Sequence, residues 1–242
     1  MHENTGKVKT VARVAGVTSV LLTGKGEPFK NYDDVLFFSE SFKEYPLEIQ
    51  TNGIWLSKSI GEIKTLRNHG VNLIAISVDS AEQSDSVKII SKAAHSNGML
   101  VRVTFNITNM FRWASRCESN RANFEEIIQW CLRLSVDQMT LRNIVSPNHT
   151  KETKQSLWIK KNVDPEYYAR LKQEMEIACK YGGFFVRSLP YGAKIYDYKG
   201  ISVSHSDYCI QDSSNGDDLR SLIFMEDGHL YTNWNSKASV LF

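Results

Sequence analysis

The chain of 242 residues lacks the features that would place it in a membrane or a secretory pathway. It has no apolar run near the roughly 18 residues that a membrane-spanning helix needs. Its first residues, MHENTGKVKT, contain no apolar segment of the kind found in signal peptides. With a formal net charge of +2, the chain also lacks the one-signed charge that would indicate binding to nucleic acid or to a membrane surface. We therefore expect a soluble, cytoplasmic protein.

Cysteine is scarce and is not spaced for a disulfide framework or a metal site. The four cysteines, Cys117, Cys131, Cys179 and Cys209, form no CxxC and no other close pair. Cys131 and Cys179 fall within amphipathic helical patterns, so both are predicted to be core residues. The chain has no HxxxH pair and no GxGxxG, P-loop or GxSxG motif. Nucleotide-phosphate and hydrolase chemistry therefore have little support.

Short apolar runs rich in β-branched residues alternate with helical patterns along most of the chain. The predicted strands span 17–22, 47–51, 73–78, 100–107, 138–145 and 184–189. The predicted helices span 32–44, 57–68, 81–96, 121–135 and 165–181, and several end at a glycine stop in NHG, SNG or YGG. This alternation predicts an α/β fold with a parallel sheet covered by helices. Six such strands are too few to close an eight-stranded barrel, so a partial barrel and an open sheet both remain possible.

The pattern changes after residue 190. Residues 191–242 contain YKGISVSHSDYCIQ and LRSLIFMEDGHLYTNW, which are predicted to form short antiparallel strands. In the second segment, Asp227-Gly228 is a favoured hairpin turn. We therefore expect a main α/β domain over 1–190 and a small C-terminal β extension over 191–242 that packs on it.

Polar residues follow the predicted strands at their carboxyl ends, where parallel α/β sheets bind ligands. The first three strands end in the segments TGKGEP (23–28), QTNG (50–53) and SVDS (77–80). The fourth and fifth present Thr104, Asn106, Thr108, Asn109, Arg142 and Asn143. Such a rim of hydroxyls, amides, carboxylates and a guanidinium suits a polar zwitterion or a nucleoside better than a lipid.

Most of these residues also have a purely structural interpretation. Asn52-Gly53 is explained equally by a turn, and Asp79-Ser80 by a cap on the following helix. Arg142 is harder to explain in this way, because a guanidinium within an apolar strand needs an anionic or multiply accepting partner.

Taken in order, the strand ends resemble those of the radical S-adenosylmethionine superfamily. LLTGKGEP resembles the strand that carries the GGEP motif of that family, with Lys25 between Gly24 and Gly26-Glu27-Pro28. LEIQTNG, LIAISVDS, VTFNIT and MTLRNIV resemble the strands that follow, and the likeness covers about residues 10–190. The resemblance implies a partial (β/α)6 TIM-like barrel that binds S-adenosylmethionine across its strand ends.

The resemblance also implies which part of the cofactor each strand end would contact. The methionyl ammonium would lie in the loop that contains Thr23, Gly24, Gly26, Glu27 and Pro28, with Glu27 fixing the loop, beside the Thr51 and Asn52 of TNG. Ser77 and Asp79 would face the ribose hydroxyls, and Thr104 and Asn106 the ribose or the methionyl part. Arg142 would contact the methionyl carboxylate or the substrate, and Ile144 and Val145 would line the adenine site.

The iron–sulfur cluster of the family has no ligands in this chain. The family holds a [4Fe-4S] cluster on a CxxxCxxC loop after its first strand, upstream of the GGEP strand. Only 16 residues precede Val17 and none is cysteine, while 8–16 are predicted to be the tail of a helix. Cys117 comes after the fourth strand, where the family does not bind its cluster. We therefore expect the first strand and the cluster loop to be missing, and this chain alone to be inactive in reductive cleavage.

Three functional hypotheses follow. The first is an N-terminally truncated radical enzyme whose complete form would cleave S-adenosylmethionine to a 5′-deoxyadenosyl radical and act on an unidentified substrate. The second is a non-catalytic relative that binds S-adenosylmethionine or a partner, with another chain covering the exposed barrel edge. The third is an aldolase-like barrel enzyme, which would need a Schiff-base lysine at a strand end and has only Lys25 in the first loop. The sequence identifies neither the catalytic residues nor the substrate.

Overall fold

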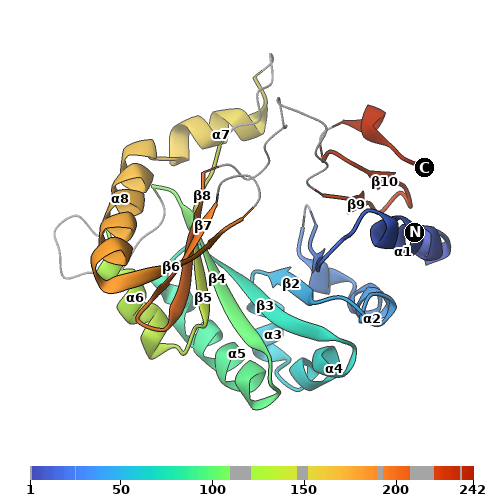
Figure 1. The fold of residues 1–242 in the computed structure, drawn as a ribbon, viewed down its shortest axis with the longest axis horizontal. Coiled ribbons are helices and arrows are strands. Elements are labelled where there is room, and N and C mark those ends of the chain that lie inside the picture. The colour runs from blue at the N-terminus through green and yellow to red at the C-terminus, as the bar shows by residue number, and fades with distance from the viewer. Residues whose placement is uncertain are drawn as a thin grey trace.

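An eight-stranded sheet forms the centre of the molecule (Figure 1). The structure is a computed structural model that describes residues 2–24, 26–109, 121–145, 152–189, 193–207, 221–234 and 236–242. Along the sheet, the strands are β1 (Val20–Leu22), β2 (Leu47–Thr51), β3 (Val71–Val78), β4 (Leu100–Ile107), β5 (Gln138–Asn143), β8 (Ile201–Ser206), β7 (Lys194–Tyr198) and β6 (Gly183–Ser188). Strands β1 to β5 and β8 are parallel, and β7 is antiparallel to both of its neighbours.

Helices cover one face of this sheet. They are α1 (Thr5–Val14), α2 (Tyr32–Ser41), α3 (Ile54–Lys58), α4 (Glu62–Asn68), α5 (Ser84–Ser96), α6 (Phe124–Arg133), α7 (Lys154–Asn162) and α8 (Pro165–Gly182). Helices α2 to α6 and α8 lie along the outside of the sheet, whereas α7 lies beyond the strand ends (Figure 1). Alternate strand residues point toward these helices and are buried, including Ile49, Ile76, Val103, Leu141 and Val203. The core of the protein is this interface between sheet and helices.

The opposite face of the sheet is polar. The residues that alternate with the buried ones include Glu48, Gln50, Ser77, Arg102, Thr104, Asn106, Gln138, Thr140, Arg142, Ser202, Ser204 and Ser206. The prediction of near-continuous apolar strands is therefore wrong for this sheet, because only one of its faces is packed against helices. The alternation was present in the sequence, with a period of two residues, and indicates a half-buried sheet.

The local predictions were most accurate for β1 to β5. These strands lie within or close to the predicted ranges, and the helix tail expected over 8–16 belongs to α1. The helix predicted over 57–68 is two short helices, α3 and α4. Helix α7 was not predicted.

The sixth parallel strand is β8 and not the predicted strand at 184–189. The chain leaves β6, turns back through β7 and inserts β8 beside β5, so that β6 lies at the edge of the sheet. Strands β7 and β8, which had been predicted as part of a separate extension, therefore belong to the main sheet. Local periodicity does not contain this result, because the pairing of β5 with β8 joins residues about 60 positions apart.

The remainder of the C-terminal segment lies beside the N-terminal helices. Strands β9 (Ile223–Phe224) and β10 (Leu230–Tyr231) form an antiparallel pair, and Gly228 in the predicted turn has φ 82°. The ring of Phe224 lies 6.0 Å from that of Phe38 on α2, and Asn4 Nδ2 donates to the Gly228 carbonyl at 2.8 Å. The last segment of the chain thus returns to the end of the sheet where β1 lies (Figure 1).

The predicted glycine stops have two different explanations. Gly70 and Gly98 have φ of 99° and 67°, as expected for a left-handed residue that ends a helix. Gly183 has φ −125°, so the prediction of a left-handed stop in YGG is wrong there. Gly183 instead allows a close approach, since a Cβ at this position would lie 2.4 Å from the Asp197 carbonyl oxygen. No helix of the described residues is long and apolar enough to cross a membrane.

A buried polar cluster joins α8 to the end of β8. Asp207 accepts hydrogen bonds from Tyr168 Oη at 2.8 Å and from Lys172 Nζ at 2.7 Å. Its carboxylate also lies 3.4 Å from Nδ1 of the buried His205. Burial lowers the pKa of His205 from its ordinary value of 6.5, although the charge of Asp207 opposes the change.

Because burial lowers the pKa of His205, the folded state resists a proton that the unfolded chain accepts. We expect the free energy of unfolding to fall as the pH drops from about 7 to about 5, through the ordinary histidine pKa. The variant His205→Gln, which cannot take up this proton, should show a shallower decrease over the same range. Urea denaturation at several pH values measures both slopes. Equal slopes for the two proteins would show that His205 does not contribute.

Candidate functional site

Glu27 ties the loop after β1 to the end of β2. Its Oε1 accepts a hydrogen bond from Thr51 Oγ1 at 2.7 Å, and its Oε2 accepts one from the Asn52 backbone N–H at 2.8 Å. The same side chain caps the short helical turn Pro28–Lys30 by accepting from the Phe29 N–H at 3.4 Å. Glu27 therefore fixes the position of the loop, as the resemblance implied.

Aromatic packing anchors this loop from below. Phe29 is buried and stacks on Trp55 of α3 with a ring separation of 4.8 Å. Tyr32 lies 5.0 Å from the Trp55 ring, and its hydroxyl donates to Glu62 at 2.5 Å. Pro28 starts the turn that delivers Phe29 to this cluster. The apolar anchor holds Glu27 in place and leaves its carboxylate directed at β2.

The TNG segment adopts the structural role that its sequence allowed. Gly53 has φ 76° and begins α3, and Asn52 Oδ1 accepts a hydrogen bond from the Ile54 N–H at 2.9 Å. Thr51 Oγ1 both donates to Glu27 and accepts from the Gly53 N–H at 3.0 Å. The turn is therefore real, and it also presents Thr51 and Asn52 to the loop after β1.

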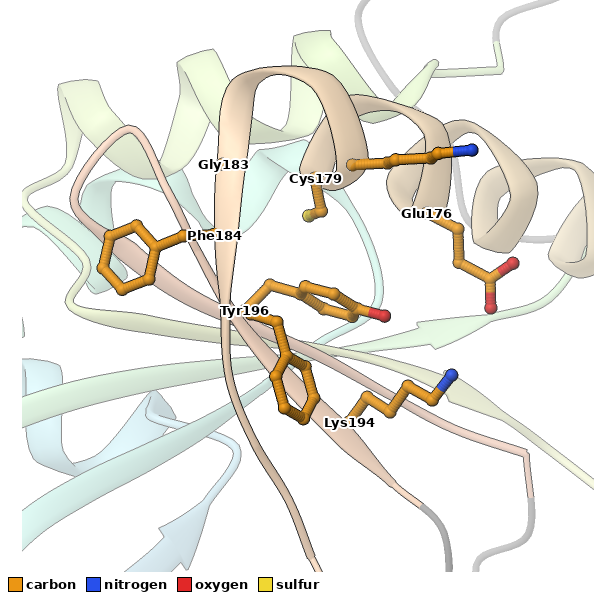
Figure 2. Close-up of a pocket in the computed structure, with 8 residues that line it drawn as sticks. Glu176, Cys179, Gly183, Phe184, Lys194 and Tyr196 are labelled. Atoms are coloured by element: carbon orange, nitrogen blue, oxygen red, sulfur yellow. The ribbon is translucent and has the colours of Figure 1, made fainter.

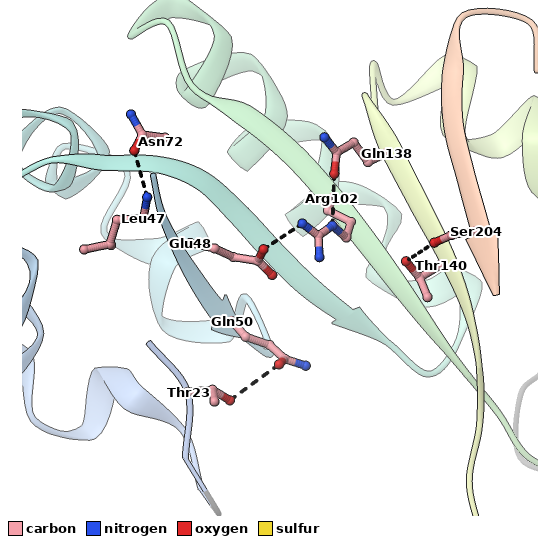
Figure 3. A network of polar contacts seen from close by, with 9 residues as sticks. All are labelled: Thr23, Leu47, Glu48, Gln50, Asn72, Arg102, Gln138, Thr140 and Ser204. Carbon is pink, nitrogen blue, oxygen red and sulfur yellow. Dashed lines mark hydrogen bonds and ion pairs between the residues drawn. The ribbon is translucent and has the colours of Figure 1, made fainter. Parts of the chain in front are cut away.

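A pocket of about 290 Å³ lies where the first three strand ends meet. It is lined by Thr23, Gly24, Gly26, Glu27, Gln50, Thr51, Asn52 and Ser77. Seven of these residues were predicted, whereas Gln50 was not. Gln50 bridges the strands, since its Oε1 accepts from Thr23 Oγ1 (Figure 3) and its Nε2 donates to Ser77 Oγ, both at 3.4 Å.

Asp79 and Asn106 meet across the next two strand ends. Asn106 Nδ2 donates to Asp79 Oδ1 at 3.0 Å. The backbone N–H groups of Asp79 and Ser80 are capped by Gln83 Oε1, at 2.7 and 3.3 Å. Of the two interpretations of Asp79, the structure thus does not support the cap, and its exposed carboxylate faces the neighbouring strand.

Arg142 lies apart from the pocket, on the same polar face. In the β4–β5–β8 ladder it aligns with Asn106 and Ser206, while Thr104 is buried one step earlier on β4. Three strand spacings separate β5 from β2, which corresponds to about 14 Å. The Arg142 guanidinium makes no hydrogen bond or ion pair with any other residue that the structure describes. It is therefore open to an anionic group of a ligand.

The structure does not bring the other predicted residues into the pocket. Ile144 and Val145 follow β5 and are half-buried, and neither lines the pocket beside Glu27. Pro28 contributes through its turn and is not a lining residue. Lys25 of the same loop lies outside the described residues.

A polar network deeper on the same face was missed. Arg102 Nη2 donates to Glu48 Oε2 at 2.6 Å, and its Nε donates to Gln138 Oε1 at 3.0 Å (Figure 3). Burial raises the pKa of Glu48, against the opposing charges of Arg102 and Arg142. Alternate polar residues within apolar strands are the signal that could have identified this network.

The cysteines that the structure describes do not fit an iron–sulfur cluster. Cys131 on α6 and Cys179 on α8 are both buried. Burial raises the pKa of both thiols, that of Cys179 to about 11, which opposes the thiolate form that iron requires. Within the described residues, no group of three His, Cys, Asp or Glu side chains could hold a metal ion. Cys117 and Cys209 lie outside these residues.

Comparison with known proteins adds no assignment. No protein-family model matches the chain, and a search of curated proteins gives no significant match. What the site can do therefore follows from its geometry. Near Glu27 it offers a carboxylate and open glycine backbone, and toward Arg142 it offers hydroxyls, an amide, a carboxylate and a guanidinium.

The hydrogen bond between Glu27 and Thr51 should couple the two residues energetically. We expect Glu27→Ala and Thr51→Val each to lower the free energy of unfolding by about 1–2 kcal/mol. The double variant should lose about 1 kcal/mol less than the sum, because the shared bond can be removed only once. Urea denaturation of the four proteins measures this coupling.

Thr10→Val provides the control for this cycle. Thr10 Oγ1 donates within α1, to the Gly6 carbonyl, and so has no contact with the loop. Its effect should add to that of Glu27→Ala without coupling. Additive effects of Glu27→Ala and Thr51→Val would contradict the assignment of Glu27 as the residue that fixes the loop.

Proposed function

We propose that this chain binds S-adenosylmethionine across the carboxyl ends of β1 to β5, in a partial barrel similar to that of radical S-adenosylmethionine enzymes. The observation that carries the proposal is the single pocket shared by seven residues predicted from three separate segments, Thr23, Gly24, Gly26, Glu27, Thr51, Asn52 and Ser77. These segments come together only because β1, β2 and β3 are adjacent and parallel.

The pocket suits the ammonium end of the ligand. Gly24 and Gly26 have no side chains to cover the loop backbone, so its carbonyl groups are accessible to a donor. Glu27 adds a negative charge, and Thr23 adds a hydroxyl oxygen. Such a set of acceptors favours a cation that donates several hydrogen bonds.

The remaining strand ends suit the rest of the ligand. At about 290 Å³, the pocket is at the small end of ligand sites, so the ligand must extend along the sheet. Asp79 and Asn106 together offer an acceptor and an amide, which complement ribose hydroxyls. Arg142 lies farther along the same edge and is placed to pair with the methionyl carboxylate.

For this chain, the proposal is limited to binding. Reductive cleavage of S-adenosylmethionine needs a [4Fe-4S] cluster, which supplies the electron and anchors the methionyl group. Because Cys131 and Cys179 are buried, we propose cleavage only for an assembly in which another polypeptide segment supplies the thiolates. The same observation favours, for the chain alone, a protein that binds S-adenosylmethionine without cleaving it.

Calorimetric titration tests the binding proposal. We expect S-adenosylmethionine to bind with a stoichiometry of one, and 5′-methylthioadenosine, which lacks the amino-acid portion, to bind roughly tenfold more weakly. Arg142→Met and Glu27→Gln should weaken the binding of S-adenosylmethionine and leave that of 5′-methylthioadenosine nearly unchanged. Arg133→Met, at an exposed position on α6, removes the same charge elsewhere and should have no effect. Equal affinity for the two compounds, or no binding of either, would overturn the proposal.

Cluster reconstitution tests the limit to binding. Anaerobic incubation of the chain with iron and sulfide should leave no stable cluster after gel filtration, because the described thiols are buried on two different helices. Iron and sulfide bound per chain are measured chemically. A stoichiometric cluster that is lost in a Cys131→Ala or Cys179→Ala variant would contradict the fit described above.

A further inference from the structure

A second pocket lies at the other end of the sheet (Figure 2). Its volume is about 440 Å³, within the range of small-molecule sites. The residues that line it are Glu176, Cys179, Lys180, Gly183, Phe184, Phe185, Lys194 and Tyr196. They come from the last turns of α8 and from β6 and β7. Four strands, β3, β4, β5 and β8, separate β7 from β2, so this pocket is distinct from the one beside Glu27.

The pocket results from the way α8 joins the edge of the sheet. The helix ends at Gly182, and β6 begins at once with Gly183, which packs closely against the Asp197 carbonyl. Helix α8 therefore lies directly over the β6–β7 pair. At this point the helix presents Cys179, whose small side chain leaves a space that a larger residue would fill.

Aromatic side chains form the apolar part of the pocket. The rings of Phe185 and Tyr196 lie 5.8 Å apart in an edge-to-face arrangement. Phe185 is 54% exposed although it is a large apolar residue. An aromatic ring is the ligand group that would cover these faces with the least loss of conformational freedom.

The charged side chains of the rim favour an anion. Lys180 and Lys194 make no ion pair with a described residue, and the Lys180 ammonium lies 5.4 Å from the ring of Tyr181. Glu176 is the single acidic lining residue, and its carboxylate lies 3.8 Å from His205 Nε2. The side chains of Glu176 and Lys194 extend toward each other across the opening (Figure 2). Two lysines against one glutamate leave a net positive rim.

We propose that this pocket binds a small planar aromatic carboxylate. The ring packs against Phe185 and Tyr196, and the carboxylate pairs with Lys180 and Lys194. The ring supplies the burial, while the two ammonium groups orient the ligand. This site is independent of S-adenosylmethionine, because it shares no residue with the strand ends of β1 to β5.

A second copy of the chain is a less suitable occupant of this edge. Pairing through β6 would require a regular strand, and β6 carries an irregularity in register between Phe185 and Arg187. Such bulges and a charged residue on an edge strand oppose the addition of another strand. Self-association is therefore treated as an outcome of the test.

Titration with indole-3-acetate, followed by amide chemical shifts of the full chain, tests the proposal. We expect saturable shifts at α8, β6 and β7, and weaker binding of indole-3-acetamide, which has the same ring without the charge. Lys180→Met and Lys194→Met should each weaken the binding of indole-3-acetate about threefold to fivefold, as expected for partly exposed ion pairs. Lys88→Met, on the exposed side of α5, is the matched control and should leave the affinity unchanged.

A second variant separates the contact of the ring from the charge. Phe185→Ala alters an exposed residue, so the chain should still fold, and the affinity for the acid and the amide should fall by the same factor. Equal affinity for the acid and the amide in the unaltered protein would overturn the assignment of the lysines. Shifts only around Glu27, or dimerisation through β6 in sedimentation, would overturn the assignment of the pocket.

Discussion

The burial of one face of the sheet is the constraint on which the rest of the structure depends. Alternate residues of each strand, such as Ile76, Val103 and Leu141, are buried beneath the helices. A shift of one residue in any strand would expose its apolar side chains and bury polar ones, so the register is strongly determined. Because the register is determined by the buried face, the residues on the opposite face are aligned as well. The polar face thus acquires its order from the core behind it.

This indirect alignment accounts for the candidate site. Ser77, Thr104, Thr140 and Ser204 occupy matching positions on four adjacent strands, and Asn106, Arg142 and Ser206 lie one step farther along. Only the loop after β1 lies outside the ladder, and Glu27 ties it to β2 through Thr51 and Asn52. A single carboxylate therefore attaches an irregular loop to a regular sheet. This division leaves hydroxyls and charges available along the polar face.

The two ends of the sheet differ for a related reason. At the β1 end, helices α1 and α2 and the β9–β10 pair gather around a short strand of three residues. At the β6 end, α8 is followed directly by an edge strand whose residues Phe184 and Phe185 are largely exposed. Apolar side chains left at an edge create a pocket when charged groups surround them, as Lys180 and Lys194 do here. The unequal cover of the two edges thus gives each end its own cavity.

The sequence by itself determined the local features of this protein. The strands β1 to β5, the helices between them, the Gly53 turn and the hairpin at Gly228 all follow from spacing and residue type over a few positions. Seven residues of the pocket could be predicted because a parallel sheet gathers its strand ends at one edge. Only the tertiary structure decided that β8 pairs with β5, that Gln50 completes the pocket, and that Arg102 pairs with Glu48. These features depend on contacts between distant residues, whose free energy comes from packing of the whole sheet and leaves no periodic signal in the chain.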